Sequence, residues 1–152
     1  MNRRKMIIAA LVIGSATLMA SKTFAATAPI DTAKKPGVAL GGYDAVAYFV
    51  NKVPTPGKAD FKLNWKDVDW YFASADNLKL FEASPEKYAP QYGGYCAYAA
   101  AKGSVAAGDP EAWSVVDGKL YINLSPAVQK LWQSDIPGYI LKADKNWPNL
   151  IK

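Results

Sequence analysis

The 152-residue sequence contains no histidine and only one cysteine, Cys96. Without histidine, neither a Ser–His–Asp triad nor a Cys–His pair can form, which excludes hydrolases that depend on an imidazole base. A lone cysteine cannot form a disulfide within the chain, so packing must stabilise the fold. The sequence also has no Walker loop, and its Gly-Gly pairs lack the spacing of a dinucleotide-binding loop.

The first 25 residues have the layout of an export signal. Arg3, Arg4 and Lys5 precede an uncharged apolar run over residues 6–21, and small residues follow, so we expect cleavage after Ala25. The apolar run is too short, and too rich in Ala, Ser and Gly, to favour a stable membrane span. The pattern therefore predicts a cleaved signal peptide and a periplasmic protein.

Removal of residues 1–25 changes the charge and the inventory of the chain. The full sequence has 18 basic and 13 acidic residues, a formal net charge of +5, and four of the basic residues lie in the signal. The remaining chain has a formal charge of +1, and all its basic residues are lysines. This near balance gives no support for nucleic-acid binding.

The pattern after the signal indicates one α+β domain. Residues 26–37 are small, polar and contain proline, which predicts a flexible lead-in before a domain over residues 38–152. Alternating apolar residues predict an aromatic hairpin over 61–74 and a second hairpin over 112–124, with Asp117-Gly118 as its turn. The segment 44–50 is a short apolar helix or strand that periodicity does not distinguish.

Several short helices accompany the two hairpins. Ser84, Asp109 and Ser125 each precede a proline, a pattern typical of a helix N-cap followed by the first helical position. Ser74 is expected to cap another helix, and Pro137 to open the last one. We find no internal repeat and no second domain. The sequence thus predicts a single compact domain with two β-hairpins and several short helices.

The stretch "YGGYCAYAAAKG", residues 92–103, contains the cysteine. Its alanines and final glycine predict a helical turn, with Cys96 in the first turn, where unpaired N–H groups favour a thiolate. No histidine can act as a base, and Asp44 becomes a polar partner only if the fold brings the two Gly-Gly turns together. The alternative is an unreactive, partly buried cysteine with a structural role, since free cysteine is among the most buried residue types.

The tyrosines beside Cys96 are open to two interpretations. Tyr92, Tyr95 and Tyr98 either line a pocket with their hydroxyl groups or form hydrogen bonds at the edge of the core. We expect most other large aromatic side chains to pack in the core because they occur at strand or helix spacing; these are Phe61, Trp65, Trp70, Phe72, Phe81, Trp132 and Trp147. The predicted site residues are therefore Cys96, Asp44, Tyr95 and Tyr92.

The run "WYFASADNLKLFEASPEKYAPQYGGYC" resembles the YHS domain, and the flanks "GGYDAVAYF" and "DKNWPNL" resemble exported single-domain YHS proteins. This resemblance extends from Val38 to Leu150. It implies metal binding, with copper the most plausible ion and Cys or His as ligands. The sequence departs from that pattern, because it keeps Cys96 but has "FASADN" where metal-linked relatives carry further cysteines.

A soft-metal site takes two to four sulfur or nitrogen ligands, so Cys96 requires at least one further ligand. A homodimer could pair two Cys96 thiolates around Cu(I), or Asp44 or a tyrosine could complete a mixed site. A tryptophan face could also cover a thiolate-bound ion.

Three functions follow from these residues. The first is a non-enzymatic exported protein that binds a metal ion or small ligand around Cys96. The second is a thiol-dependent redox protein or enzyme that uses an activated Cys96. The third is an interaction or scaffold protein with a structural Cys96.

Overall fold

The computed structural model describes residues 26–152, so the predicted signal peptide lies outside the described residues. The helices and strands in chain order are η1 (Ala39–Gly42), α1 (Ala47–Val50), β1 (Lys58–Trp65), β2 (Val68–Phe72), α2 (Ala75–Ala83), α3 (Pro85–Tyr88), η2 (Gln91–Gly94), α4 (Ala97–Ala101), β3 (Asp109–Val116), β4 (Lys119–Asn123), α5 (Pro126–Trp132), η3 (Gln133–Asp135) and α6 (Ile136–Leu150). No helix of this described part is long and apolar enough to cross a membrane.

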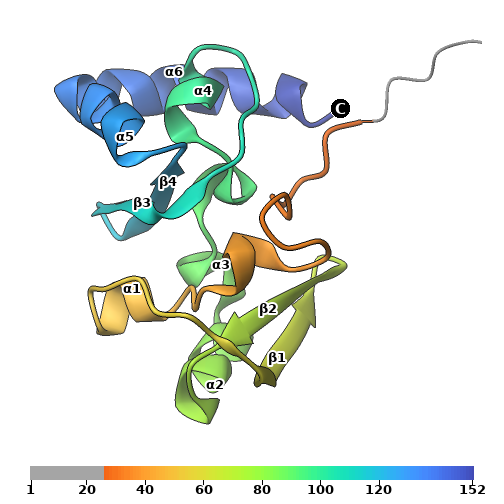
Figure 1. Ribbon diagram of the computed structural model, residues 1–152. Coiled ribbons are helices and arrows are strands. Elements are labelled where there is room, and N and C mark those ends of the chain that lie inside the picture. The colour runs from red at the N-terminus through yellow and green to blue at the C-terminus, as the bar shows by residue number, and fades with distance from the viewer. Residues whose placement is uncertain (1–25) are drawn as a thin grey trace, which may run out of the picture.

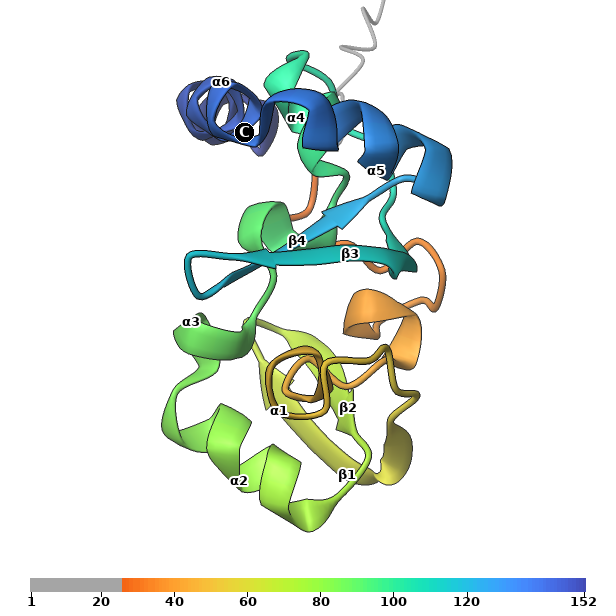
Figure 2. The same cartoon turned by 90° about the vertical axis from the view of Figure 1, so that its left-hand side faces the viewer.

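The predicted α+β fold is confirmed. Strands β1 and β2 form one antiparallel hairpin, and β3 and β4 form a second. Figures 1 and 2 show two tiers, with β1, β2 and α1–α3 in the lower tier and the β3–β4 hairpin covered by α4, α5 and α6 in the upper tier. The segment 44–50, which was open to two interpretations, contains helix α1.

The two tiers are two copies of one structural unit, so the expectation of no internal repeat was wrong. The first unit (residues 39–83) runs through a 3-10 turn, a short helix, a hairpin and a helix, and the second unit (residues 91–132) repeats this order. Both hairpins have the same register, with a bulge at Lys58/Lys62 in the first and at Asp109/Trp113 in the second.

The repeat is weak in sequence because it depends on a few backbone-determining residues. "LGGYDA" (residues 40–45) and "YGGYCA" (residues 92–97) share only the pattern G-G-Y-x-A. Leu40, Gly41 and Gly42 have φ values of 52°, 60° and 90°, and their counterparts have 54°, 62° and 88°. Glycine adopts such left-handed conformations readily, which explains the glycine pair in each unit.

Two of the four predicted caps, Ser74 and Ser125, form a side-chain hydrogen bond, whereas Ser84 stands at the N-cap position of α3 without one. The Ser74 hydroxyl accepts a hydrogen bond from the backbone N–H of Asn77 at 3.1 Å, and the Ser125 hydroxyl accepts from that of Val128 at 3.2 Å. These equivalent serines satisfy N–H groups that would otherwise lack partners at the start of α2 and α5.

The helix start predicted at Asp109-Pro110 was wrong, since both residues begin strand β3. The register of the hairpin shifts between Asp109 and Trp113. At such a bulge the missing N–H of proline interrupts no regular ladder bond, which explains why Pro110 is tolerated in a strand.

Strand β4 lies between the two hydrophobic cores. Leu120 and Ile122 belong to the core of the first unit, whereas Tyr121 between them belongs to the core of the second. Successive side chains of a strand point to opposite faces, so one strand serves both cores. The interior of each unit contains an equivalent aromatic pair: Trp70 with Phe81, and Tyr121 with Trp132.

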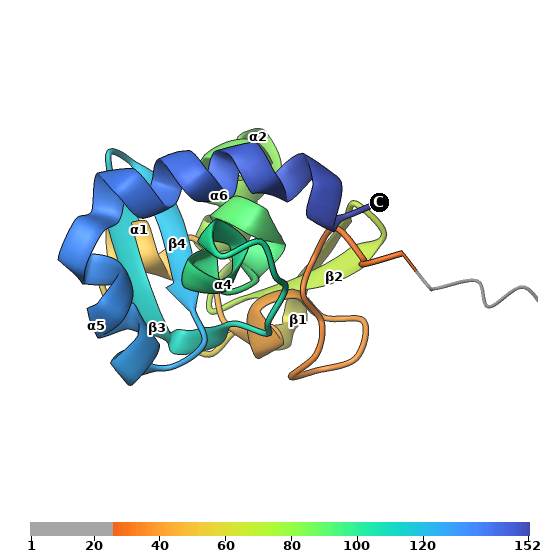
Figure 3. The same ribbon diagram turned by 90° about the horizontal axis from the view of Figure 1, so that it is seen from above.

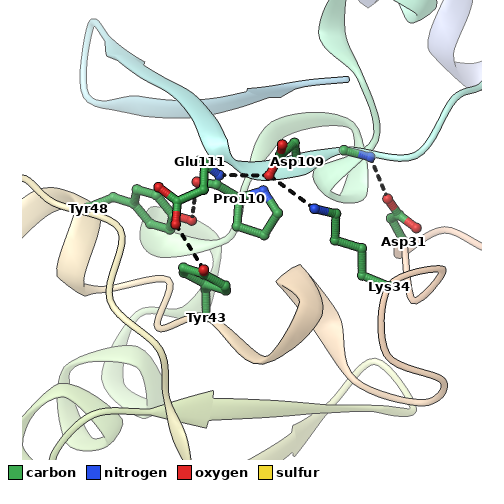
Figure 4. A network of polar contacts seen from close by, with 8 residues as sticks. Asp31, Lys34, Tyr43, Tyr48, Asp109, Pro110 and Glu111 are labelled. Atoms are coloured by element: carbon green, nitrogen blue, oxygen red, sulfur yellow. Dashed lines mark hydrogen bonds and ion pairs between the residues drawn. The ribbon is translucent and has the colours of Figure 1, made fainter. Parts of the chain in front are cut away.

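Polar contacts also join the units (Figure 4). The Tyr48 hydroxyl donates to the Pro110 carbonyl at 2.8 Å, and the Tyr43 hydroxyl donates to the Glu111 carboxylate at 2.9 Å. Both tyrosines come from the first unit and both acceptors come from β3. The contacts therefore fix the second hairpin against the first unit.

The lead-in was expected to be flexible, but part of it packs against the second unit. The Asp31 carboxylate accepts the Gly108 N–H at 2.8 Å, and the Asp31 N–H donates to the Gly93 carbonyl at 2.9 Å. Gly93 allows this approach, because a Cβ at that position would lie 1.8 Å from the Pro29 carbonyl oxygen. Figure 4 shows Asp31 and Lys34 reaching toward β3 from this segment.

The buried Tyr48 hydroxyl between the two units predicts that the protein loses stability at alkaline pH. Burial raises the pKa of Tyr48, with the Glu111 carboxylate a smaller cause. Above about pH 10, the ordinary pKa of tyrosine, the unfolded chain loses a proton that the folded chain keeps, so the free energy of unfolding falls as pH rises. Phenylalanine has no hydroxyl to ionise. Between pH 8 and pH 11, the free energy of unfolding of Tyr48→Phe should therefore fall by roughly 1 kcal/mol less than that of the unaltered protein. Urea unfolding at pH 8 and pH 11 measures this difference, and an equal fall in both proteins would contradict it.

Candidate functional site

Cys96 is buried at the start of α4, with 1% of its surface exposed. Its sulfur accepts a hydrogen bond from the Ala99 N–H at 3.5 Å, and its thiol donates to Asn123 Oδ1 at 3.7 Å. The same Asn123 oxygen accepts the Tyr98 N–H at 3.0 Å. Cys96 and Asn123 thus share the capping of this helix, in which the cysteine acts as a small buried acceptor.

Asp44 occupies the equivalent position in the first unit and is fully buried. One carboxylate oxygen accepts the N–H groups of Val46 and Ala47 at 2.8 and 3.2 Å. The other accepts the Ala73 N–H at 2.8 Å and the Asn77 side-chain amide at 2.7 Å. Four N–H donors satisfy the buried carboxylate, which joins the start of α1, the end of β2 and α2.

The structure does not bring Asp44 to Cys96 as partners. Each residue caps a helix of its own unit, and their hydrogen-bond partners are all different. Their equivalence explains why both follow a Gly-Gly-Tyr turn. The two residues therefore do not form a shared site.

The surroundings of Cys96 do not fit a copper ion. The side-chain atoms within hydrogen-bond distance provide one sulfur and one amide oxygen, fewer soft donors than copper or zinc requires. Within residues 26–152, no three His, Cys, Asp or Glu side chains form a group that could hold a metal ion. A metal bridge between two Cys96 thiolates would need the sulfur at the surface, where it does not lie.

A cleft of about 470 Å³ opens where the two units, the lead-in and the end of α6 meet. We call it the seam cleft and define it by six of its lining residues, which are Trp65, Lys66, Glu86, Tyr92, Asp144 and Trp147. Figure 3 shows the C-terminal end of α6 beside the start of the lead-in, and both segments contribute to the wall. Of the four predicted site residues, only Tyr92 lines this cleft.

Four polar side chains of the seam cleft are arranged in two pairs. The Tyr92 hydroxyl donates to the Asp144 carboxylate at 2.8 Å, and Lys66 Nζ lies 3.1 Å from a Glu86 carboxylate oxygen. Burial, followed by the Asp144 carboxylate, raises the pKa of Tyr92 well above its usual value. Tyr92 therefore remains a hydrogen-bond donor at neutral pH.

Three aromatic residues, Trp65, Tyr92 and Trp147, line the cleft. The Trp147 ring packs against those of Tyr92 and Tyr95, with both centroid separations 5.7 Å. Tyr95 thus supports the wall from behind through Trp147. Trp65, the remaining one of the three, lies at the end of β1, and the ammonium group of Lys66 lies 4.3 Å from the centroid of its ring.

The sequence did not identify Trp65 and Trp147 as site residues, because their spacing predicts core positions. Both are half-buried and pack against the cores while also lining the cleft, so that prediction was correct in part. Asp144 and Glu86 carry no local motif. Only the close approach of the two units brings these residues to one cleft.

Comparison with known proteins gives a match to one family. Residues 46–92 match the family model of the YHS domain. This segment runs from the start of α1 to the Gly-Gly turn that opens the second unit. No curated protein and no solved structure matches the chain.

The capping role of Asp44 predicts a large stability effect. Asp44→Ala leaves four N–H donors without their acceptor, two of them at the buried residues Val46 and Ala47, so we expect the free energy of unfolding to fall by about 3 kcal/mol or more. Asp60→Ala, which alters an exposed aspartate of β1, should change it by less than about 0.5 kcal/mol. Urea unfolding of both variants measures the difference, and similar values would contradict the assigned role of Asp44.

The burial of Cys96 predicts an unreactive thiol. We expect iodoacetamide to alkylate the folded protein at least about a hundredfold more slowly than the urea-unfolded protein, because reaction requires local opening. Mass spectrometry over time follows this reaction. Fast alkylation of the folded protein would instead support the thiol-dependent function.

Proposed function

The chain contains a YHS domain over residues 46–92, and we propose that it is a non-enzymatic binding protein that holds a small organic ligand in the seam cleft. The observation that carries this proposal is the composition of the cleft. Aromatic rings provide apolar contact area, while Tyr92, Asp144, Glu86 and Lys66 provide polar groups at defined positions. Small-molecule sites commonly combine an apolar lining with a few polar groups and have volumes of about 300–1,000 Å³.

The chemistry of the lining favours binding over covalent catalysis. None of the residues that line the cleft is Cys, His or Ser, which are the side chains that most often act as activated nucleophiles or bases. Tyr92 is held protonated, and its hydroxyl is bonded to Asp144. These groups are suited to orienting a ligand.

We also propose that the protein is exported and works in the periplasm. The support is the signal-like sequence at residues 1–25, with cleavage after Ala25. A mature chain starting at Ala26 keeps Pro29 and Ile30, which line the seam cleft. Processing at this position therefore leaves the wall of the proposed site complete.

The metal and thiol alternatives both require Cys96 to meet something from outside. Copper binding is supported by the family resemblance, but the donors near Cys96 do not fit that ion. A redox or enzymatic thiol requires access to a sulfur that is 1% exposed. The observations therefore favour a ligand in the seam cleft over both alternatives.

A comparison of two tryptophan variants tests the proposed function. The mature protein, Trp147→Ala and Trp113→Ala are each incubated with a small-molecule extract of the exported fraction, and bound compounds are identified by mass spectrometry. Trp113 lines a different groove, with Tyr48 and Val115, and so provides a matched control. We expect at least one compound to be retained by the mature protein and Trp113→Ala but lost from Trp147→Ala.

Two further measurements make the result decisive. Asp144→Asn changes an exposed residue of the cleft and should weaken retention without unfolding the protein, which far-ultraviolet circular dichroism verifies. Elemental analysis of the mature protein and Cys96→Ser tests the metal alternative. Retention that is independent of Trp147 and Asp144, or copper that depends on Cys96, would contradict the proposal.

A further inference from the structure

The seam cleft contains a cation supplied by its own chain. Lys66 Nζ lies 4.3 Å from the centroid of the Trp65 ring and 3.1 Å from a carboxylate oxygen of Glu86. The face of an indole ring attracts cations, and a carboxylate beside it adds a charged hydrogen-bond acceptor. These two groups form a niche that accepts an ammonium group, and we call it the Trp65–Glu86 niche.

We propose that the ligand of the seam cleft is a small organic cation whose ammonium group replaces Lys66 in the Trp65–Glu86 niche. This inference rests on the proposed function and names the chemical class of its ligand. Lys66 then acts as an internal competitor that covers the niche while no ligand is bound.

The charge of the cleft favours a cation. Its charged lining residues are Lys66, Glu86 and Asp144, which gives a formal charge of −1. An anionic ligand would meet two carboxylates and a lysine that is already paired. In the free protein the two carboxylates of the cleft face the positive charge of Lys66. A cationic ligand that displaces Lys66 into solvent would provide a positive charge in its place.

Other residues that line the cleft can hold the rest of such a ligand. Tyr92 donates to one oxygen of Asp144 and so fixes the position of that carboxylate. The Trp147 ring is held in turn by Tyr92 and Tyr95. An aliphatic or aromatic body attached to the ammonium group can pack against this ring, and a polar substituent can reach Asp144.

Lys66 can leave the niche without disturbing the hairpin. It lies in the two-residue turn between β1 and β2, where Lys66 and Asp67 have φ values of 53° and 61°. The backbone of the turn is fixed by the flanking strands, whereas the long side chain is about half exposed. Movement of Nζ into water therefore requires only side-chain rotation.

Comparison of the two units shows that the indole and the lysine of this niche occur only in the first. The equivalent turn of the second unit is Asp117-Gly118, preceded by Val116 instead of Trp65. The second unit thus has neither the indole nor the lysine at this position. The niche is a feature of the unit that contains most of the YHS match.

Butylammonium tests the inference because it has the chemistry of the end of a lysine side chain. It is titrated into the mature protein labelled with ¹⁵N, and 1-butanol serves as the uncharged control of similar length. We expect butylammonium to shift the indole N–H signals of Trp65 and Trp147, to leave that of Trp113 in place, and to bind at least about fivefold more tightly than 1-butanol.

Two lysine variants test the competition. Lys66→Met should strengthen butylammonium binding by about tenfold, because it removes a tethered competitor and one positive charge. Lys62→Met removes the same charge from the same hairpin but lies outside the cleft, where it pairs with Asp69, and should leave the affinity nearly unchanged. Glu86→Gln should weaken binding severalfold.

Each failure has a distinct meaning. Equal binding of 1-butanol and butylammonium, or no shift of the Trp65 signal, would overturn the proposal that the ligand is a cation. Retention of a compound that depends on Trp147 would still support the proposed function. Equal effects of Lys66→Met and Lys62→Met would overturn the competition by Lys66. If no compound depends on Trp147 for its retention, both proposals are overturned.

Discussion

Strand β4 is the element on which the arrangement of the whole molecule depends. Its alternating side chains place Leu120 and Ile122 in the core of the first unit and Tyr121 in the core of the second. The two faces of this strand therefore belong to different cores, and the two units cannot separate without exposing apolar surface. This shared strand fixes the distance and orientation between the units, and the seam cleft exists because that geometry is fixed.

The equivalence of Asp44 and Cys96 changes the meaning of the only cysteine. In the first unit, one carboxylate satisfies four N–H donors. In the second unit, Cys96 and Asn123 divide part of the same task between a sulfur and an amide oxygen. Placement behind a Gly-Gly turn is thus explained by capping in both units, and the position needs no reactive or metal-binding role to account for it.

Much of the fold could be predicted from the sequence, because its signals are local. The Asp117-Gly118 turn, the alternation before Trp65 and the caps at Ser74 and Ser125 each act within a few residues, and the structure contains all of them. The repeat could not be recognised in the same way. Its units share a backbone path, but their cores use different side chains, such as Trp70 and Phe81 in one and Tyr121 and Trp132 in the other.

The candidate site was harder to predict for a related reason. Tyr92 was identified as a possible pocket residue, whereas Trp65 and Trp147 have the spacing of core residues and also face a cleft formed by distant segments. An experimental structure of the mature protein soaked in butylammonium would decide how this cleft is used. The account predicts the amine between Trp65 and Glu86, with Lys66 turned into solvent. Density for the amine elsewhere, with Lys66 still over the Trp65 ring, would contradict it.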